Sequence, residues 1–229
     1  IFMALYGKGM LITFSETQPA VEEDFNEWYN REHIDERVWM PGFHRARRYV
    51  DANATAEIKY CATYETNKVE DLADPDYMEL LKDQSDWSKK VMSTFTKFDR
   101  ITATVTIDLS HGFGGACCVV RFFPKSDVMS KLREALQFDL LPSIISKPGV
   151  IGAVLVENNL SVANEGRRAQ GIEIPENETP EWVIIIESQD SQVLSAQIKK
   201  EIKLEFSEFG IGSTDIKIAT YNLMFGNNR

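Results

Sequence analysis

The chain has 229 residues, of which 43% are hydrophobic, and its 25 Lys and Arg against 35 Asp and Glu give a formal net charge of −10. This composition is typical of a soluble globular protein with room for one large domain or two domains of about 100 residues, and it excludes a disordered, collagen-like or disulfide-stapled chain. Because an acidic protein repels a phosphate backbone and an anionic membrane surface, we expect neither nucleic acid nor a membrane as a partner.

The first half of the chain reads as strand, helix, two strands, helical material and a further strand. Pro19 lies near the start of the first helix, and acidic residues in the first turn suit the positive end of the helix dipole. Pro41 and Gly42 then break this helix. The expected elements are a strand at 10–14, a helix at 20–37, strands at 43–50 and 57–66, helical material over 67–95 interrupted near Pro75, and a strand at 100–109.

The second half repeats this order of elements. Its first helix is broken by Pro148 and Gly149, just as Pro41 and Gly42 break the first-half helix. When the two Pro-Gly pairs are aligned, helix falls on helix and strand on strand, without gaps across the region. The expected elements are a strand at 116–123, a helix at 126–145, strands at 150–157 and 182–187, a helix at 191–206 and a strand at 215–224.

The order β-α-β-β-α-β, found twice, predicts an α+β fold of two ferredoxin-like repeats. We expect the repeats to occupy residues 1–110 and 111–229, with the glycine-rich run at 112–115 as the linker. Helices cover one face of each such sheet, and the other face has to be covered as well. The two sheets are therefore expected to pack face to face around a barrel-like interior. A chance coincidence of two Pro-Gly turns is the alternative.

The first-half helix carries polar residues where the second-half helix is apolar. Tyr29, His33 and Arg37 all correspond to Leu or Ile when the two Pro-Gly pairs are aligned. They follow one another at intervals of four, so in a helix they share one stripe. Glu36 lies within reach of His33, and a carboxylate beside an imidazole raises the imidazole pKa and sets its tautomer; Glu32 is the other candidate for this role.

These residue types are the ones needed to move a proton beside a carbonyl group. His33 would transfer the proton, and Tyr29 would donate a hydrogen bond to a developing oxyanion. Arg37, or an arginine of the strand from Arg45 to Arg48, would hold a carboxylate or an enolate. Trp28 and Trp39 would form the walls of the pocket. The alternative is a solvated helix face whose charged residues form structural ion pairs.

The strand at 43–49 is the second candidate for substrate binding. Its alternation predicts one face made of Phe43, Arg45, Arg47 and Tyr49. The opposite face would carry His44, Ala46 and Arg48. Three arginines so close together in an acidic protein favour a pocket for an anionic substrate. The alternative is an outer strand whose arginines pair with acidic residues of the same hairpin.

Metal and redox signals are weak in this sequence. His33, His44 and Glu36 are ligand types of a two-His, one-carboxylate site, but their separation is unknown and no zinc spacing is present, so we expect no metal. An odd number of cysteines without a CxxC motif predicts reduced, buried thiols and a cytoplasmic location. The opening residues lack the pattern of a signal peptide. The segment 164–181 is long for a hairpin connection and is interpreted as a lid or a dimer arm.

The run FNEWYNREHIDERVWMPGFHRARRYV, residues 25–50, resembles EthD-like members of the dimeric α/β-barrel superfamily. Such members often show a helix reading W-Y-x-x-E-H-x-x-x-R, then P-G-F and an R-R-Y strand. The resemblance implies the same fold for nearly the whole chain, as a tandem duplication. The residues that it carries over are Trp28, Tyr29, Glu32, His33, Arg37 and Tyr49. The family often has Pro where this chain has Asp35.

Superfamily members include cofactor-free cyclases, isomerases, decarboxylases and quinone-forming monooxygenases, with some haem binders. We therefore expect a cofactor-independent acid–base enzyme, an isomerase, cyclase or lyase, acting on a small hydrophobic or aromatic carbonyl compound or carboxylic acid in a catabolic or secondary pathway. One alternative is a non-catalytic binding protein for a hydrophobic metabolite or an accessory to an oxygenase. The other is a haem-dependent member. A homodimer is left open, because the barrel could close within one chain or between two.

Overall fold

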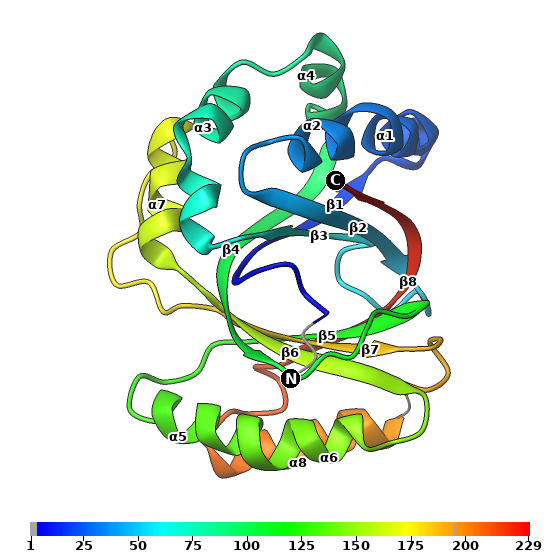
Figure 1. Cartoon of the computed structure of the whole chain (residues 1–229), viewed down its shortest axis with the longest axis vertical. Coiled ribbons are helices and arrows are strands. Elements are labelled where there is room, and N and C mark those ends of the chain that lie inside the picture. Colours follow the sequence, from blue (N-terminus) through cyan, green and yellow to red (C-terminus); the bar gives the residue numbers. More distant parts are fainter. Residues whose placement is uncertain (1–3, 195) are drawn as a thin grey trace.

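The computed structural model describes residues 4–194 and 196–229, so the first three residues of the opening segment and one residue of the expected helix 191–206 lie outside the described residues. Within these ranges eight antiparallel strands form one closed barrel in the order β1-β3-β2-β8-β5-β7-β6-β4 (Figure 1). The strands are β1 (Gly9–Thr17), β2 (Phe43–Asp51), β3 (Tyr60–Thr66), β4 (Phe95–Asp108), β5 (Ala116–Phe122), β6 (Val150–Asn158), β7 (Trp182–Ser188) and β8 (Lys217–Asn228).

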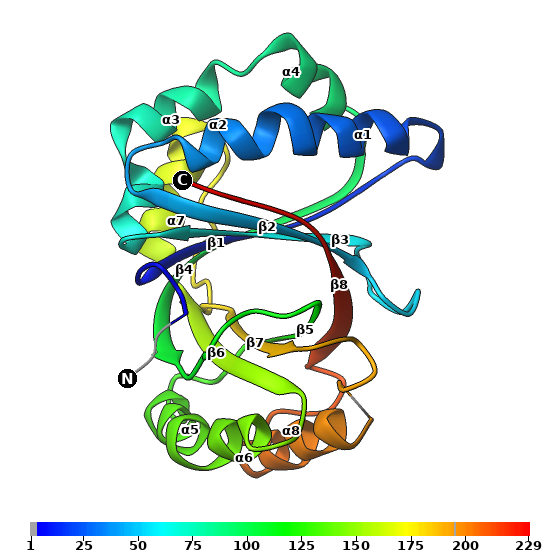
Figure 2. The ribbon, with the colours of Figure 1, turned by 45° about the vertical axis from the view of Figure 1, so that its right-hand side comes forward.

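Helices cover the barrel on two opposite sides, as Figures 1 and 2 show. On the first side lie η1 (Pro19–Val21), α1 (Glu22–Trp28), the π-helical turn η2 (Tyr29–His33), α2 (Ile34–Val38), η3 (Val69–Ala73), α3 (Pro75–Lys82), α4 (Asp86–Met92) and α7 (Leu160–Ala169). On the second side lie α5 (Met129–Ala135), the π-helical turn η4 (Leu136–Leu140), α6 (Leu141–Ile145) and α8 (Ala196–Glu208).

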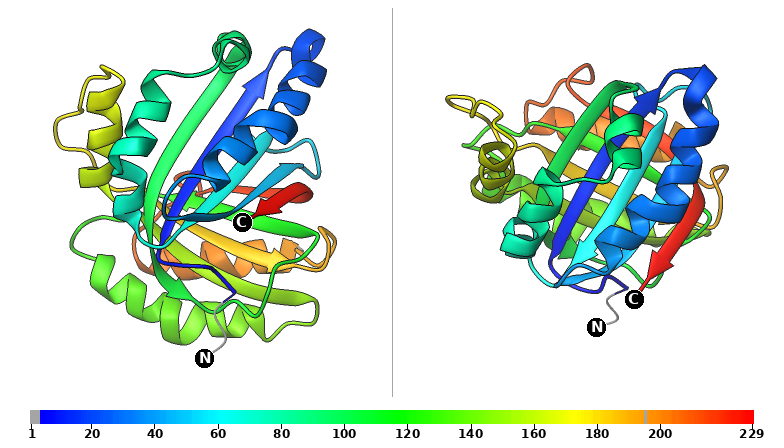
Figure 3. Two further views of the ribbon diagram at one scale, coloured as in Figure 1. Left: turned by 45° about the horizontal axis from the view of Figure 1, so that its top comes forward. Right: turned by 90° about the horizontal axis from the view of Figure 1, so that it is seen from above.

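Helix α7 was not expected, because its residues were interpreted as part of an open connection. The side chain of Asn159 caps its first turn by accepting a hydrogen bond from the backbone N–H of Val162. The buried face of α7 packs beside α3 and η3, so a segment of the second half covers part of the first-half sheet (Figure 3). The helix therefore belongs to the first helical layer, although its sequence neighbours belong to the opposite sheet.

The barrel closes within one chain. The first-half strands pair in the order β4-β1-β3-β2, and the second-half strands pair in the order β8-β5-β7-β6. Within each half, the strands therefore lie in the same order: fourth, first, third and second. The pairs β2–β8 and β4–β6 join the two sheets (Figure 2). These pairings confirm the α+β class and the barrel, and they answer the question of whether one chain can close it.

The alignment of the two Pro-Gly pairs is matched in the geometry as well. In that alignment α5, η4, α6 and β6 begin at the same positions as α1, η2, α2 and β2. Gly42 and Gly149 both have a φ of 82°, the left-handed region that glycine adopts most readily, where the chain leaves its first helix. Strands β2 and β6 also share a register irregularity at corresponding positions.

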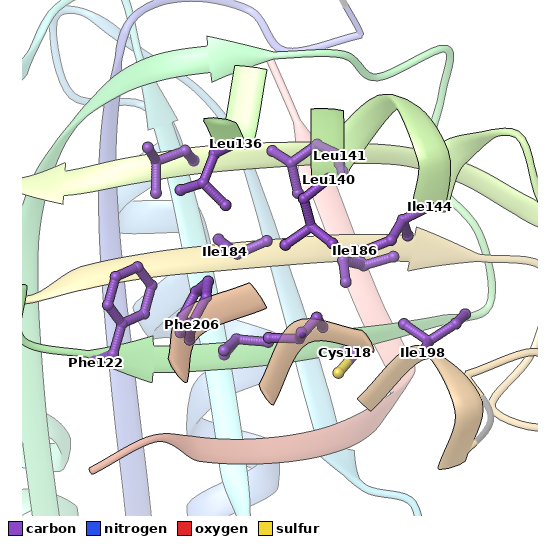
Figure 4. Close-up of a cluster of buried hydrophobic side chains, with 14 of the residues drawn as sticks. Cys118, Phe122, Leu136, Leu140, Leu141, Ile144, Ile184, Ile186, Ile198 and Phe206 are labelled. Carbon is purple, nitrogen blue, oxygen red and sulfur yellow. The ribbon is translucent and has the colours of Figure 1, made fainter. Parts of the chain in front are cut away.

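The two helical layers are packed with different side chains. Figure 4 shows Leu136, Leu140 and Ile144 of the second layer lying on strand β7 and facing helix α8. All the labelled side chains in this view are apolar or sulfur-containing, and their burial supplies roughly 1.5–3 kcal/mol for each large apolar side chain. The first layer instead contains buried Trp28, Tyr29 and Tyr77, which belong to the same buried cluster as Tyr64 of β3. Polar side-chain groups are therefore buried beneath the first helical layer.

The first sheet also has a charged inner face. Arg47 of β2 lies inside the barrel, where it bonds Glu65 of β3 and Glu187 of β7. Around these charges the interior is apolar, with residues such as Met10, Ile12 and Val183 packed together. Within the described residues, no helix combines the length and the hydrophobicity that crossing a lipid bilayer requires.

Candidate functional site

A cavity of about 60 Å³ lies between the first sheet and its covering helices. Strands β1 and β3 contribute Leu11, Thr13 and Tyr64. The helix running from α1 through α2 contributes Trp28, Tyr29, His33 and Arg37. The remaining lining comes from α3, α4, β4 and the end of α7, with Tyr77, Leu81, Gln84, Met92, Phe95, Phe98, Arg100 and Gln170. Four predicted site residues are therefore brought to one cavity, together with side chains that the sequence analysis did not single out.

Four buried polar atoms around this cavity have no hydrogen-bond partner among the described residues. They are Oγ1 of Thr13, Nδ1 of His33, the hydroxyl of Tyr64 and Oε1 of Gln84. An unsatisfied buried polar group costs roughly 1–3 kcal/mol, so such groups are few in folded proteins. Their convergence on one cavity indicates a place built to bind a polar ligand rather than one optimised for packing.

The π-helical turn η2 sets the geometry of His33. A π-helical turn bonds residues five apart, which brings Trp28 beside His33 with ring centroids 4.2 Å apart. The rings of Tyr29 and His33 also lie close, at 4.9 Å. The same turn occurs as η4 in the apolar second layer. The two layers therefore differ here in their side chains and not in the turn itself.

The pKa of His33 is lowered well below its ordinary value, first by burial and then by the positive charges of Arg37 and Arg48. This corrects the expectation that a neighbouring carboxylate raises it. Among the described residues no carboxylate bonds to the imidazole, and Nδ1 is buried without a partner. The imidazole is therefore held neutral and keeps a free nitrogen beside the cavity.

The two acidic residues expected to orient His33 have other partners. Glu36 accepts a hydrogen bond of 2.6 Å from Nη1 of Arg37, and burial raises the pKa of Glu36. Glu32 accepts hydrogen bonds from Ser85 and from Ser88. Glu32 thus ties the helix to the start of α4. Glu36 is paired with Arg37, which borders the cavity.

Arg48, predicted only as one of the arginines of the strand at 43–49, lies close to Tyr29 and His33. It is buried, its guanidinium lies 4.2 Å from the centre of the Tyr29 ring, and it donates to the amide oxygens of Asn26 and Asn30 at 2.7 and 2.6 Å. No carboxylate among the described residues pairs with it, so its positive charge acts on Tyr29 and His33. The alternation of strand β2 correctly separated Arg48 from Arg45 and Arg47. The alternation did not indicate that Arg48 lies on the face that packs against the helix containing Tyr29 and His33.

Arg45, Arg47 and Tyr49 do not reach this cavity. They point to the opposite face of the sheet, into the barrel, where Arg45 forms two hydrogen bonds with Glu65 and the hydroxyl of Tyr49 donates to Glu187. Both arginines are paired with carboxylates, although they also border a separate cavity of about 260 Å³ beside Phe113. Phe43 was expected on that same face, but the register irregularity after Phe43 turns it to the helical layer.

Trp39 does not form a wall of the cavity. Its side chain is 64% exposed, and the guanidinium of Arg229 lies 5.3 Å from its ring. His44 bonds Asn67, away from His33. No group of three or more His, Cys, Asp or Glu within the described residues has the arrangement of a metal site. The cysteines are free and buried as expected, and burial raises the pKa of Cys61 to about 12.

No family model matches the sequence, and no curated protein matches it. The structure is similar to an anthrone oxidase-like protein, with a TM-score of 0.65 and 11% identity over 96% of this chain and 92% of that one. It is similar to a protein from Fusobacterium nucleatum that is provisionally assigned as a monooxygenase (TM-score 0.61, 11% identity, 98% and 96% of the chains). A mutant chlorite dismutase from Candidatus Nitrospira defluvii gives a TM-score of 0.56 at 6% identity over 93% and 90%. At such low identity the similarity establishes the fold alone.

Proposed function

We propose that the chain is a cofactor-independent enzyme that binds a small hydrophobic or aromatic carbonyl compound or carboxylic acid beside His33 and moves a proton on it. The observation that carries this proposal is the unpaired Nδ1 of His33, buried beside a cavity and held neutral next to two arginines. A neutral imidazole with a free nitrogen is a general base, and neighbouring cations stabilise the anion that deprotonation creates.

Proton transfer in this site starts at the carbon next to the substrate carbonyl. The imidazole takes a proton from that carbon, and the electron pair of the broken C–H bond moves to the carbonyl oxygen as an enolate. Arg37 is placed to bind that oxygen or a substrate carboxylate, and the hydroxyl of Tyr64 is free to donate a hydrogen bond. Return of the proton to another carbon gives an isomer, and loss of a leaving group from the enolate gives a lyase reaction.

The aromatic lining supports the preference for a hydrophobic substrate. Trp28, Tyr77 and Phe95 border the cavity, and Phe98 borders it while remaining half exposed. A ligand larger than the cavity would therefore extend over an aromatic side chain at its edge.

Deuterium exchange tests the proton transfer without knowledge of the final product. Aryl ketones and aryl keto acids, such as phenylacetone and phenylpyruvate, are incubated with the protein in D2O and followed by NMR. We expect accelerated exchange at the carbon beside the carbonyl. His33→Gln should lower that rate by a factor on the order of 10²–10⁴. His44→Gln, a histidine outside the cavity, should leave it unchanged. Binding without exchange across the panel would favour the non-catalytic binding protein.

The names of the fold neighbours suggest oxidation as another outcome of the same proton removal. Oxygen uptake measured in the exchange assay separates an oxidase from an isomerase or lyase.

We further propose that the protein is an EthD-like member of the superfamily, acts in the cytoplasm, and is built from two duplicated ferredoxin-like units at residues 1–110 and 111–229. The recurrence of helices, turns and glycine conformations at aligned positions of the two halves supports the duplication.

A further inference from the structure

A second cavity lies at one end of the barrel, on the inner face of the sheet. Its volume is about 200 Å³, and it is bordered by Phe14 of β1, Val119 of β5 and Tyr221 of β8. Phe14 follows Thr13, whose side chain borders the His33 cavity, and successive side chains of a strand point to opposite faces. Strand β1 therefore separates the two cavities.

The walls of this cavity suit an apolar ring. Phe14, Val119 and Tyr221 are almost completely buried, and the hydroxyl of Tyr221 already donates to the backbone oxygen of Ile58 at 3.0 Å. Tyr221 therefore presents its ring without an unmet hydrogen bond. A cavity of about 150 Å³ is enough to bind benzene in an engineered protein, so this volume admits one substituted ring.

Arg121 supplies the polar contact at this end. Its Nε and Nη2 bond Glu181 at 2.7 and 3.0 Å, and Nη2 also bonds Asp99 at 2.6 Å. Its guanidinium lies 4.2 Å from the centre of the Phe14 ring. Within the described part of the chain no acceptor bonds Nη1. The two N–H groups of Nη1 thus remain available on a well-held cation at a cavity with aromatic walls.

The charges around Arg121 select the kind of ligand. Two carboxylates surround this one guanidinium, and the nearby Lys217 is neutralised by Glu57 at 2.8 Å. The local net charge is therefore negative, which disfavours an anion. A neutral oxygen acceptor bonds Nη1 without that repulsion. The requirement differs from that of the His33 cavity, which Arg37 and Arg100 border.

We infer that this end of the barrel is a second ligand site, which binds a small neutral aromatic molecule carrying one oxygen acceptor. The ring packs between Phe14, Val119 and Tyr221, and the oxygen accepts a hydrogen bond from Nη1 of Arg121. This site stands apart from the proposed catalysis, because it shares no lining residue with the His33 cavity.

Calorimetry and ligand-observed NMR at pH 7.5 with the full chain test this site. Benzyl alcohol is the probe, benzoate its anionic analogue and benzylamine its cationic one. We expect benzyl alcohol to bind at least tenfold more tightly than either. Stronger binding of benzoate or benzylamine would overturn the charge argument.

Two variants locate the probe. Ala219→Leu adds bulk at the cavity wall and should abolish benzyl alcohol binding, whereas His33→Gln should leave it unchanged. The opposite pattern would assign the probe to the His33 cavity and refute the inference. If Ala219→Leu does not fold, the binding of benzoate and of benzyl alcohol is measured with Glu57→Gln, a variant at an exposed ion pair. It makes the local charge less negative and should improve benzoate binding relative to benzyl alcohol; an unchanged ratio would count against the inference.

Discussion

Arg47 and Glu187 meet inside the barrel, where Nη1 of the arginine donates to Oε1 of the glutamate at 2.6 Å. The two residues are 140 positions apart, on strands of different halves, and both are buried. Arg47 also pairs with Glu65 at 3.3 Å, so one guanidinium bridges a glutamate from each half. Arg47 was expected to bind an anionic substrate. Its geometry instead is that of an internal clamp.

The clamp predicts a large loss of stability when one partner is removed. Arg47→Met leaves two buried carboxylates short of a partner, so the free energy of unfolding should fall by about 3–5 kcal/mol. Adding Glu187→Gln should recover part of that loss. Arg133→Met is the control, because the Arg133–Glu157 pair is partly exposed and should contribute about 1 kcal/mol or less. Urea denaturation measures all four proteins, and equal losses for Arg47→Met and Arg133→Met would refute the clamp.

His33 predicts a specific dependence of stability on pH. Its pKa in the folded protein is well below the ordinary 6.5, so between those values the unfolded chain binds a proton that the folded protein does not. The stability that His33 contributes is therefore complete above pH 6.5 and is lost as the pH falls below it. Thermal unfolding from pH 7.5 to pH 5 should show a smaller decline for His33→Gln than for the native protein. Parallel profiles would contradict the lowered pKa. His44→Gln serves as the matched control.

The unpaired hydroxyl of Thr13 predicts that its removal does not destabilise the protein. Thr13→Val keeps the shape of the side chain and removes a buried group without a partner, so the free protein should be as stable or more stable by about 1–3 kcal/mol. Thr17 on the same strand bonds Thr94, so Thr17→Val should instead destabilise by about 1 kcal/mol. Chemical denaturation of both variants provides the comparison. A loss of stability in Thr13→Val equal to that in Thr17→Val would show that the hydroxyl is satisfied.

The corresponding glycines predict matched effects in the two halves. A Cβ at Gly42 would lie 2.5 Å from Cγ of Asp71, and one at Gly149 would lie 2.7 Å from a methyl carbon of Val193. Both glycines also have a φ of 82°, so Gly42→Ala and Gly149→Ala should each cost about 1 kcal/mol or more. The melting temperatures of the two variants, compared with that of the native protein, test this prediction. A loss at one position with no loss at the other would weaken the case for duplicated turns.

Local patterns in the sequence determined the order of the elements. Pro41 with Gly42 and Pro148 with Gly149 end their helices through backbone conformation alone, so their spacing could be read directly. The stripe of Tyr29, His33 and Arg37 was also predictable, because residues four apart in a helix are neighbours whatever surrounds them. All three border one cavity.

Only the tertiary structure decided what surrounds that stripe. The register irregularity after Phe43 depends on the pairing of β2 with β3. Helix α7 follows a second-half strand, yet it packs against α3 and η3 of the first half. Glu36 is near His33 in sequence, yet the imidazole pKa is lowered first by burial and then by the charges of Arg37 and of Arg48, which comes from a different element. A pKa depends on burial and on charges in space, and neither is encoded by spacing along one helix. The chemical character of His33 was therefore decided by the packing of the sheet against its helices.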